Sequence, residues 1–333
     1  MTECLIIGAG IVGLSTAYEL KKHGYKVTII DKTKEGQSSK SAAGIIFPLN
    51  PWENLKSMQE LCITGHSEYN HFLKELSQAE KKKINWEKKD LIIFGKNIES
   101  ARKWYEKNKF VESKFIKKKL TQVEKNIKEK YENYLLIKNI NTLSPRKLIE
   151  FYKKILLSQG VIFKNENIKN IYNYIDYQKN HIYDFVVVTT GAWSKEVFGK
   201  EYIKVKPIKG QLLHFKTKKK ILHNVLLYNE YYILPRDNNN IIAGATIEDV
   251  GFKSNTTLDA KNNLKNFIYE IFDNSVEINE SKMTFGFRPY SETGKPYINV
   301  DSKNKRIIYN FGHYRYGVLT SIASAKLVRK FMI

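Results

Sequence analysis

The sequence predicts an α/β chain in which a parallel sheet is combined with a second part built on an antiparallel sheet. Three observations support this fold class. Two apolar segments near the N-terminus, residues 5–7 and 27–30, are joined by a glycine-rich turn and a helical pattern. A third apolar run at 185–188 also ends in small residues. Alternation of apolar and polar residues over 205–244 is typical of antiparallel strands.

Residues 4–31, CLIIGAGIVGLSTAYELKKHGYKVTIID, form a predicted strand–helix–strand unit with glycines spaced GxGxxG. Gly8 permits a tight exit from the first strand, Gly10 leaves room for a pyrophosphate, and Gly13 lets the helix approach the sheet. The free N–H groups at the start of the helix then face the phosphates. Asp31 ends the second strand, where a carboxylate can accept a hydrogen bond from a ribose hydroxyl. This unit predicts a dinucleotide site.

A segment of small residues, a predicted helix and a lysine-rich stretch follow Asp31. Small residues at 38–48, SSKSAAGIIFP, indicate backbone that lies close to a flat or charged group. Residues 52–80 have apolar positions at three-to-four spacing, which predicts one helix. The lysine-rich stretch that follows contains a predicted strand at 91–94 and a predicted helix at 98–108.

The middle of the chain returns to the α/β pattern. Ser144, followed by a proline, is a predicted helix N-cap, and that helix should run to Ser158. Strands are predicted at 161–163 and 168–172. The segment 184–194, DFVVVTTGAWS, predicts a third buried parallel strand whose small C-terminal residues allow a ligand to approach closely.

The last third supplies most of the antiparallel part. VKPIKGQLLHF and NEYYILPRDNNNIIAG predict strands, with a hairpin turn at 237–240. A helix is predicted at 258–272, and a strand at 281–290 ends in Arg288-Pro289. A strand at 307–311, a tight glycine turn and a helix from residue 318 complete the chain. Early, middle and late segments thus build the parallel sheet, and the segments between them build the antiparallel one.

Composition restricts the possible partners and compartments. The 333 residues include 42% hydrophobic ones, which argues against disorder. The formal net charge is +22, from 56 basic and 34 acidic side chains. Such a charge could bind nucleic acid or an anionic membrane, but the lysines are spread along the chain, so we favour a solvated lysine-rich surface and expect no DNA partner.

Cysteine usage and hydropathy favour a cytoplasmic protein. Cys4 and Cys62 are the only cysteines, and they form neither a CxxC pair nor a metal-binding spacing. We therefore expect no metal site and no disulfide, as in a reducing compartment. No apolar run reaches the ~20 residues that span a bilayer, and no signal peptide is recognisable.

Seven motifs together resemble one family. They are GAGIVG with Asp31, SSKSAAGIIFPLNPW, TTGAWS, VKPIKGQLLHF, YYILPR with IIAGATIEDVGF, GFRPYSETGKPYI, and GHYRYGVLTSIASAKL. This set resembles the FAD-dependent D-amino acid oxidase family, and within it most of all the glycine oxidases of thiamine biosynthesis. The resemblance implies a discontinuous Rossmann-like FAD-binding domain and an antiparallel substrate domain. The implied boundaries are 1–80, 142–204 and 295–333 for the first domain, and 81–141 and 205–294 for the second.

The resemblance also implies which residues contact the cofactor, FAD. Neither cysteine lies in the flavin motifs, so we expect noncovalent binding. The pyrophosphate and ribose residues are Gly8, Gly10, Ile11, Val12, Gly13, Asp31 and Lys32. Residues near the flavin, its ribityl arm or the adenine are Ser38, Ser39, Ala43, Gly44, Ile45, Ile168 and Gly191. The loop before the last helix adds Gly312, His313, Tyr314, Arg315, Tyr316, Gly317, Val318 and Leu319.

On the substrate side, a planar guanidinium matches the carboxylate of an α-amino acid with two charge-assisted hydrogen bonds. Arg288 matches the arginine of the family that binds this carboxylate, and Tyr232 a supporting hydroxyl. Arg315 would help to hold the substrate, and Ile247 would line its side-chain end. The alternative interpretations are a surface ion pair for Arg288, a core aromatic for Tyr232 and a helix-start residue for Arg315.

The implied reaction is hydride transfer from the substrate Cα to the flavin, with no protein acid or base, followed by reoxidation by O2 to give H2O2. Glycine is the expected substrate, with sarcosine and small D-amino acids secondary, and the imine product could feed thiazole synthesis for thiamine. The family also implies a possible homotetramer. Two alternatives remain open: a D-amino acid or proline dehydrogenase that reduces a quinone, and a tRNA-modifying FAD oxidase, which the net charge would serve. A non-enzymatic FAD-binding module would leave Arg288 and Tyr232 unexplained.

Overall fold

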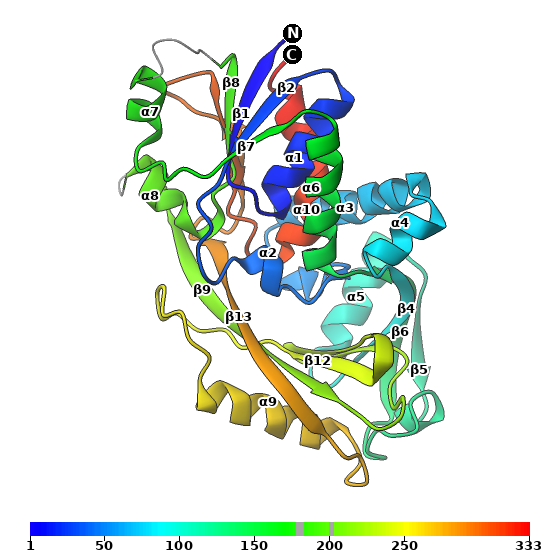
Figure 1. Ribbon diagram of the computed structural model, residues 1–333. Helices are drawn as coiled ribbons and strands as arrows, with labels where there is room; N and C mark the ends of the chain where they lie inside the picture. The colour runs from blue at the N-terminus through cyan, green and yellow to red at the C-terminus, as the bar shows by residue number, and fades with distance from the viewer. Residues whose placement is uncertain (178–182, 200–202) are drawn as a thin grey trace.

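The computed structural model describes residues 1–177, 183–199 and 203–333. Within these ranges the strands form two sheets, one in the upper half of Figure 1 and one in the lower half. The upper sheet has six strands in the order β14-β15-β8-β1-β2-β7. The lower sheet has nine: β13-β9-β12-β11-β10-β4-β6-β3 form a continuous path, and β5 pairs with β6. The predicted fold class is confirmed.

The six-stranded sheet is parallel except at its edge, where β14 runs antiparallel to β15. Its strands are β1 (Glu3–Ile7), β2 (Lys26–Ile30), β7 (Ile162–Lys164), β8 (Phe185–Val188), β14 (Tyr297–Val300) and β15 (Ile307–Phe311). Cys4 and Ile6 belong to the apolar core on one face of β1, and Leu5 and Ile7 belong to the core on the other face. Helices cover both faces of the sheet, and this explains why residues 4–7 of β1 are all apolar.

Four helices share the core on the Cys4 side of the sheet, and two short helices share the core on the Leu5 side. The first group is α1 (Ile11–Lys22), α3 (Lys56–Glu75), α6 (Pro145–Ser158) and α10 (Gly317–Lys330). The second group is α7 (Ile171–Tyr177) and α8 (Ser194–Phe198). Because α1 packs against α10, the two ends of the chain are held together in this layer.

The nine-stranded sheet is antiparallel except for the pair β10 and β4. Its strands are β3 (Ile45–Ile46), β4 (Glu87–Phe94), β5 (Ser113–Lys117), β6 (Asn133–Thr142), β9 (Val205–Lys216), β10 (Val225–Tyr228), β11 (Tyr231–Pro235), β12 (Asn240–Gly244) and β13 (Asn279–Ser291). Helix α9 (Leu258–Ile271) shares an apolar core with one face, and α5 (Ile98–Asn108) with the other. The lower part of Figure 1 shows α9 beneath β9 and β13.

Short elements complete the described chain. They are α2 (Ser38–Ser41), α4 (Gln78–Lys83), and the 3-10 helices η1 (Pro51–Glu53), η2 (Leu120–Gln122), η3 (Gly191–Trp193), η4 (Asp237–Asn239) and η5 (Tyr314–Tyr316). The helices predicted at 98–108 and from Ser144 to Ser158 are confirmed, with the Ser144 hydroxyl accepting from the Lys147 N–H. The domain boundaries stay a prediction.

Two predicted elements are wrong. The single helix predicted at 52–80 is divided into η1, α3 and α4, because Ser77 and Glu80 form a capping box that starts a new helix. The strand predicted at 168–172 does not form, because 168–170 are loop and α7 begins at Ile171. There the Asn170 side chain accepts hydrogen bonds from the N–H groups of Tyr172 and Asn173, both at 3.0 Å, and begins the helix.

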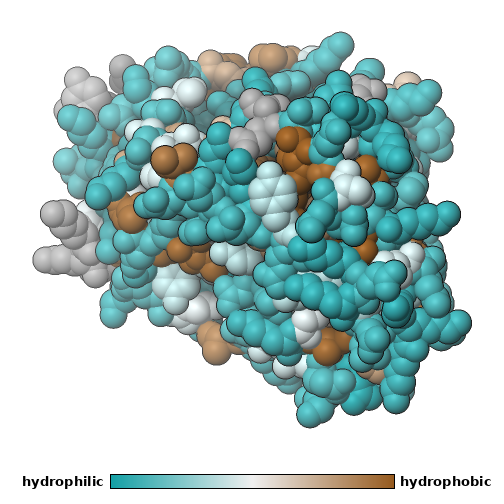
Figure 2. All heavy atoms as spheres, turned by 90° about the horizontal axis from the view of Figure 1, so that it is seen from below, coloured by the Kyte–Doolittle hydropathy of each residue, from teal (hydrophilic) through white to brown (hydrophobic). Residues whose placement is uncertain are grey.

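No helix in the described ranges is long and apolar enough to cross a membrane. The face seen from below is mostly hydrophilic, with hydrophobic residues in small separate groups (Figure 2). Many surface lysines form ion pairs with nearby carboxylates, such as Lys138 with Asp90 and Lys218 with Glu277. Such exposed pairs contribute little to stability but reduce the local excess of positive charge.

Gly65 allows α3 to pack closely against α10. A Cβ at this position would lie 2.4 Å from the Leu319 carbonyl oxygen, which is backbone and cannot rotate away. We expect Gly65→Ala to lower the free energy of unfolding by about 1–3 kcal/mol, measured as a lower melting temperature. Thr64→Ala is the matched control, since Thr64 is exposed on the same helix. Equal melting temperatures for the two variants would contradict this close packing.

Candidate cofactor and substrate site

One cavity lies where the two sheets meet. Gly8 and Thr189, at the carboxyl ends of β1 and β8, line it from the six-stranded sheet, and Leu212, Tyr232 and Arg288 line it from the nine-stranded sheet. Except for Gly13, every residue that the sequence predicts to contact the cofactor or the substrate lines this cavity. The fold therefore brings together motifs that are up to three hundred residues apart in the sequence.

The glycine turn has no room for side chains. Gly8 has a φ of +110°, and a Cβ there would lie 2.7 Å from the Thr189 carbonyl oxygen. A Cβ on Gly13 would lie 2.0 Å from the Gly8 carbonyl oxygen, so Gly13 packs beneath the turn instead of lining the cavity. The Thr189 hydroxyl contacts the carbonyl oxygens of Ile7 and Gly8, each at 2.9 Å. Thr189 is the first residue of the TTGAWS motif, and no role was predicted for it from the sequence.

Two side chains tie the start of α1 to neighbouring segments. The Asp31 carboxylate accepts a hydrogen bond of 2.9 Å from the Ala9 N–H, and the Ser39 hydroxyl accepts one of 3.1 Å from the Ile11 N–H. Gly10 is the N-cap of α1 and has no side chain to occupy the helix end. Gly10, Ile11 and Val12 line the cavity, so the positive end of the α1 dipole lies beside it, where a diphosphate could bind. The arrangement fits a dinucleotide.

Arg288 lies on β13 and opens onto the cavity. Its guanidinium donates a 3.0 Å hydrogen bond from Nη1 to the Thr246 carbonyl oxygen. It also lies against the backbone of β9, where a Cβ on Gly210 would be 2.1 Å from Nη2. Among the described residues no ion pair joins Arg288 to an Asp or Glu. Burial lowers the pKa of Arg288, and the charge of Arg315 lowers it further.

Tyr232, on β11, lies near enough to Arg288 for the charge of Arg288 to act on the Tyr232 hydroxyl. Burial raises the pKa of Tyr232 to about 12, although the positive charges of Arg288 and Arg315 act in the opposite direction. The hydroxyl is therefore protonated at neutral pH and can donate a hydrogen bond to an anion. A partly buried cation and a protonated hydroxyl together form a binding site suited to a carboxylate.

The remaining predicted residues lie around the same space. Arg315 places its guanidinium over the Tyr314 ring, 5.3 Å from the ring centroid. Ile247 also lines the cavity, and its side chain is 44% exposed. His313 is fully buried between Asn310 and Thr320, at 3.0 Å and 2.9 Å, and burial lowers its pKa to about 4. It is therefore uncharged at neutral pH and holds the start of α10.

Arg236 is a residue that the sequence analysis missed. It follows β11, and its Nη2 donates to the carbonyl oxygens of Ala43 and Leu143, the latter at 2.6 Å. Burial lowers its pKa to about 10. It thereby fixes the segment at Ala43 and Gly44, where a Cβ on Gly44 would lie 1.9 Å from the Leu143 carbonyl oxygen. The only sequence signal for this role was the position of the arginine, directly after Leu-Pro at the end of a predicted strand.

Comparisons with known proteins agree with this architecture. Iminodiacetate oxidase from Chelativorans sp. BNC1 superposes with a TM-score of 0.87 at 20% identity, covering 99% of this chain and 95% of that one. Glycine oxidase from Bacillus cereus ATCC 14579 superposes with a TM-score of 0.84 at 19% identity, covering 98% and 94%. At these identities the likeness shows the fold alone.

Sequence comparison extends the result. Glycine oxidase of Pseudomonas putida KT2440 is 24% identical over 341 residues, which cover 98% of this chain and 93% of that protein. A family model described as FAD dependent oxidoreductase, DAO, matches residues 3–330. The match spans both sheets and all the motifs that line the cavity. The chain therefore belongs to the DAO family of FAD-dependent oxidoreductases.

Proposed function

We propose that this protein is an amino acid oxidase that uses FAD to deaminate glycine and other small amino acids, with O2 as the electron acceptor. The observation that carries the proposal is the guanidinium of Arg288. It is partly buried, lines the cavity and has no carboxylate partner among the described residues. A partly buried cation in this state favours an anionic ligand, because removing an unpaired charge from water is costly.

In this proposal Arg288 and Tyr232 bind the carboxylate of the substrate. The planar guanidinium can donate two parallel hydrogen bonds, and the protonated Tyr232 hydroxyl can donate another. Arg315 contributes a second positive charge, and Ile247 lines the end where a substrate side chain would extend. These contacts orient the Cα, which is how the protein contributes to a redox step that the cofactor carries out.

FAD would be held noncovalently along the rest of the cavity. The turn from Gly8 to Gly13 and the start of α1 would receive the pyrophosphate, and Asp31 with Lys32 the ribose. The flavin and its ribityl arm would contact residues 38–45, Gly191 and the segment 312–319, while Ile168 would meet the adenine. When bound, FAD would supply the redox chemistry, which is the removal of a hydride from the Cα and the transfer of its electrons to O2. The resulting imine would be hydrolysed or passed on.

Two further parts of the proposal rest on the resemblance to glycine oxidases. The imine formed from glycine would feed thiazole synthesis in the thiamine pathway. The protein would assemble as a homo-oligomer, with a tetramer as the first state to test by light scattering. Dye reduction with negligible oxygen uptake would instead favour a dehydrogenase that uses a quinone.

We expect glycine to give peroxide with the purified FAD-bound protein, and Arg288→Ala to raise the KM for glycine by about 100-fold while FAD stays bound. Arg288→Lys should fall between the two, because it keeps the charge and loses the planar pair of donors. Arg146→Ala is the control, since the side chain of Arg146 is 73% exposed and pairs only locally with Glu150. A peroxide-coupled assay with glycine, sarcosine and D-amino acids measures these effects. If glycine gives no peroxide above that from free FAD, the substrate assignment is wrong.

Arg236→Met should weaken FAD binding by about tenfold, because the carbonyl oxygens of Ala43 and Leu143 lose a charged donor and the segment beside the flavin is released. Titration of the apoprotein with FAD, followed by flavin fluorescence, measures the affinity. Arg236→Lys should recover part of it. An unchanged FAD affinity in Arg236→Met would contradict this positioning role.

A further inference from the structure

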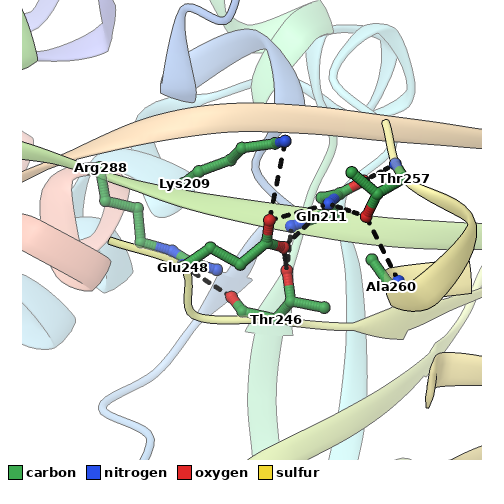
Figure 3. Close-up of polar contacts among 7 residues, drawn as sticks. All are labelled: Lys209, Gln211, Thr246, Glu248, Thr257, Ala260 and Arg288. Atoms are coloured by element: carbon green, nitrogen blue, oxygen red, sulfur yellow. Dashed lines mark hydrogen bonds and ion pairs between the residues drawn. The ribbon is translucent and has the colours of Figure 1, made fainter. Parts of the chain in front are cut away.

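A partly buried polar network lies behind Arg288. It consists of Lys209 and Gln211 on β9, Thr246 and Glu248 after β12, and Thr257 at the start of α9 (Figure 3). Only 1% of Lys209 and none of Gln211 is exposed to solvent. We call these five residues the Glu248 network. The site described above assigns them no role.

The carboxylate of Glu248 is the centre of the network. Gln211 Nε2 donates to its two oxygens at 2.8 Å and 3.1 Å, the Thr246 hydroxyl donates to Oε1, and Lys209 Nζ lies 3.6 Å from Oε2. Backbone hydrogen bonds of 2.9 Å run in both directions between Lys209 and Glu248, so the two residues are held opposite each other. Both carboxylate oxygens therefore have partners.

The amide of Gln211 has only one orientation that satisfies its neighbours. Its Oε1 accepts a 2.9 Å hydrogen bond from the Thr257 N–H, which can only donate, so Nε2 must face Glu248. The Thr257 hydroxyl in turn accepts from the Ala260 N–H and caps α9. The donor that faces Glu248 is thus fixed by a helix end.

Arg288 is close to this carboxylate and yet is not paired with it. Its Nη1 donates to the carbonyl oxygen of Thr246, two residues before Glu248, as Figure 3 shows. The negative charge of Glu248 acts on the pKa of Arg288 in the direction opposite to burial, so the two groups interact electrostatically. A carboxylate and a guanidinium that are both partly buried and lie near each other would ordinarily form an ion pair. The absence of this pair among the described contacts therefore calls for a group that holds the carboxylate elsewhere.

We propose that Lys209, supported by Gln211 and Thr246, holds the carboxylate of Glu248 away from Arg288, so that the guanidinium remains available for the carboxylate of the substrate. Lys209 is then a positioning residue, which acts on the substrate site only through Glu248. This inference rests on the proposed function, because it takes Arg288 as the carboxylate-binding group.

The test measures carboxylate binding to the FAD-bound protein without turnover. Acetate is the probe, since it has the carboxylate of glycine and no amine to oxidise, and the visible absorption of the bound flavin reports its binding. In Lys209→Met the methionine keeps much of the apolar stem and removes the charge. The Glu248 carboxylate is then expected to form an ion pair with Arg288. By competing with acetate, it should weaken acetate binding by about tenfold.

The decisive variant is the double substitution Lys209→Met with Glu248→Gln. The neutral amide that replaces the carboxylate has no charge with which to compete for Arg288, so acetate affinity should return to within about threefold of the original protein. A purely structural role for Lys209 predicts no such rescue. Lys206→Met is the matched control on the same strand, since Lys206 pairs with Asp249 at the surface, and it should leave acetate binding unchanged.

Glu248→Gln alone keeps the test valid if Lys209→Met does not fold. It should bind acetate as tightly as the original protein or more tightly, because a competing anion is removed. The inference is overturned if Glu248→Gln weakens acetate binding about tenfold with FAD retained, or if Lys209→Met leaves it unchanged. If the original protein binds no acetate and oxidises no amino acid, the proposed function has failed instead.

Discussion

A partly buried guanidinium where the two sheets meet is the constraint on which the site depends. The side chain of Arg288 leaves β13, lies against the backbone at Gly210 and is held by the carbonyl oxygen of Thr246. A neutral hydrogen bond partly replaces the water that this cation has lost, but it does not neutralise the charge. The surrounding structure therefore keeps a site that favours an anion. The protonated hydroxyl of Tyr232 adds to that preference.

The cavity exists because each sheet supplies one wall. The six-stranded sheet contributes the glycine turn and the start of α1, as expected at the carboxyl ends of parallel strands. The nine-stranded sheet contributes Tyr232 and Arg288, and the loop before α10 closes the space between them. Arg236 fixes the segment just before β3, because it extends from the end of β11 to the carbonyl oxygen of Ala43. Residues from both sheets could therefore contact FAD, the cofactor of the family.

Local patterns predicted much of this fold. The alternation of glycines and apolar runs at the N-terminus predicted β1, α1 and β2, and the helices at 98–108 and after Ser144 have the predicted bounds. The two errors also have local causes. The sequence around Ser77 contains a capping box that interrupts an apolar helical pattern, and Asn170 starts a helix where apolar residues suggested a strand. In both places a short polar side chain outweighed hydrophobic periodicity.

The sequence by itself determined the two kinds of sheet and the glycine turn, which follow from periodicity and residue spacing, and its resemblance to a known family implied many of the residues that line the cavity. Only the tertiary structure decided which charges are paired. Whether Arg288 lacks a carboxylate, whether Lys209 faces Glu248, and whether Arg236 reaches Ala43 all depend on contacts between segments that are distant along the chain. Electrostatic interactions and hydrogen bonds act over a few ångströms in space, and no local pattern specifies which distant groups the fold will bring that close.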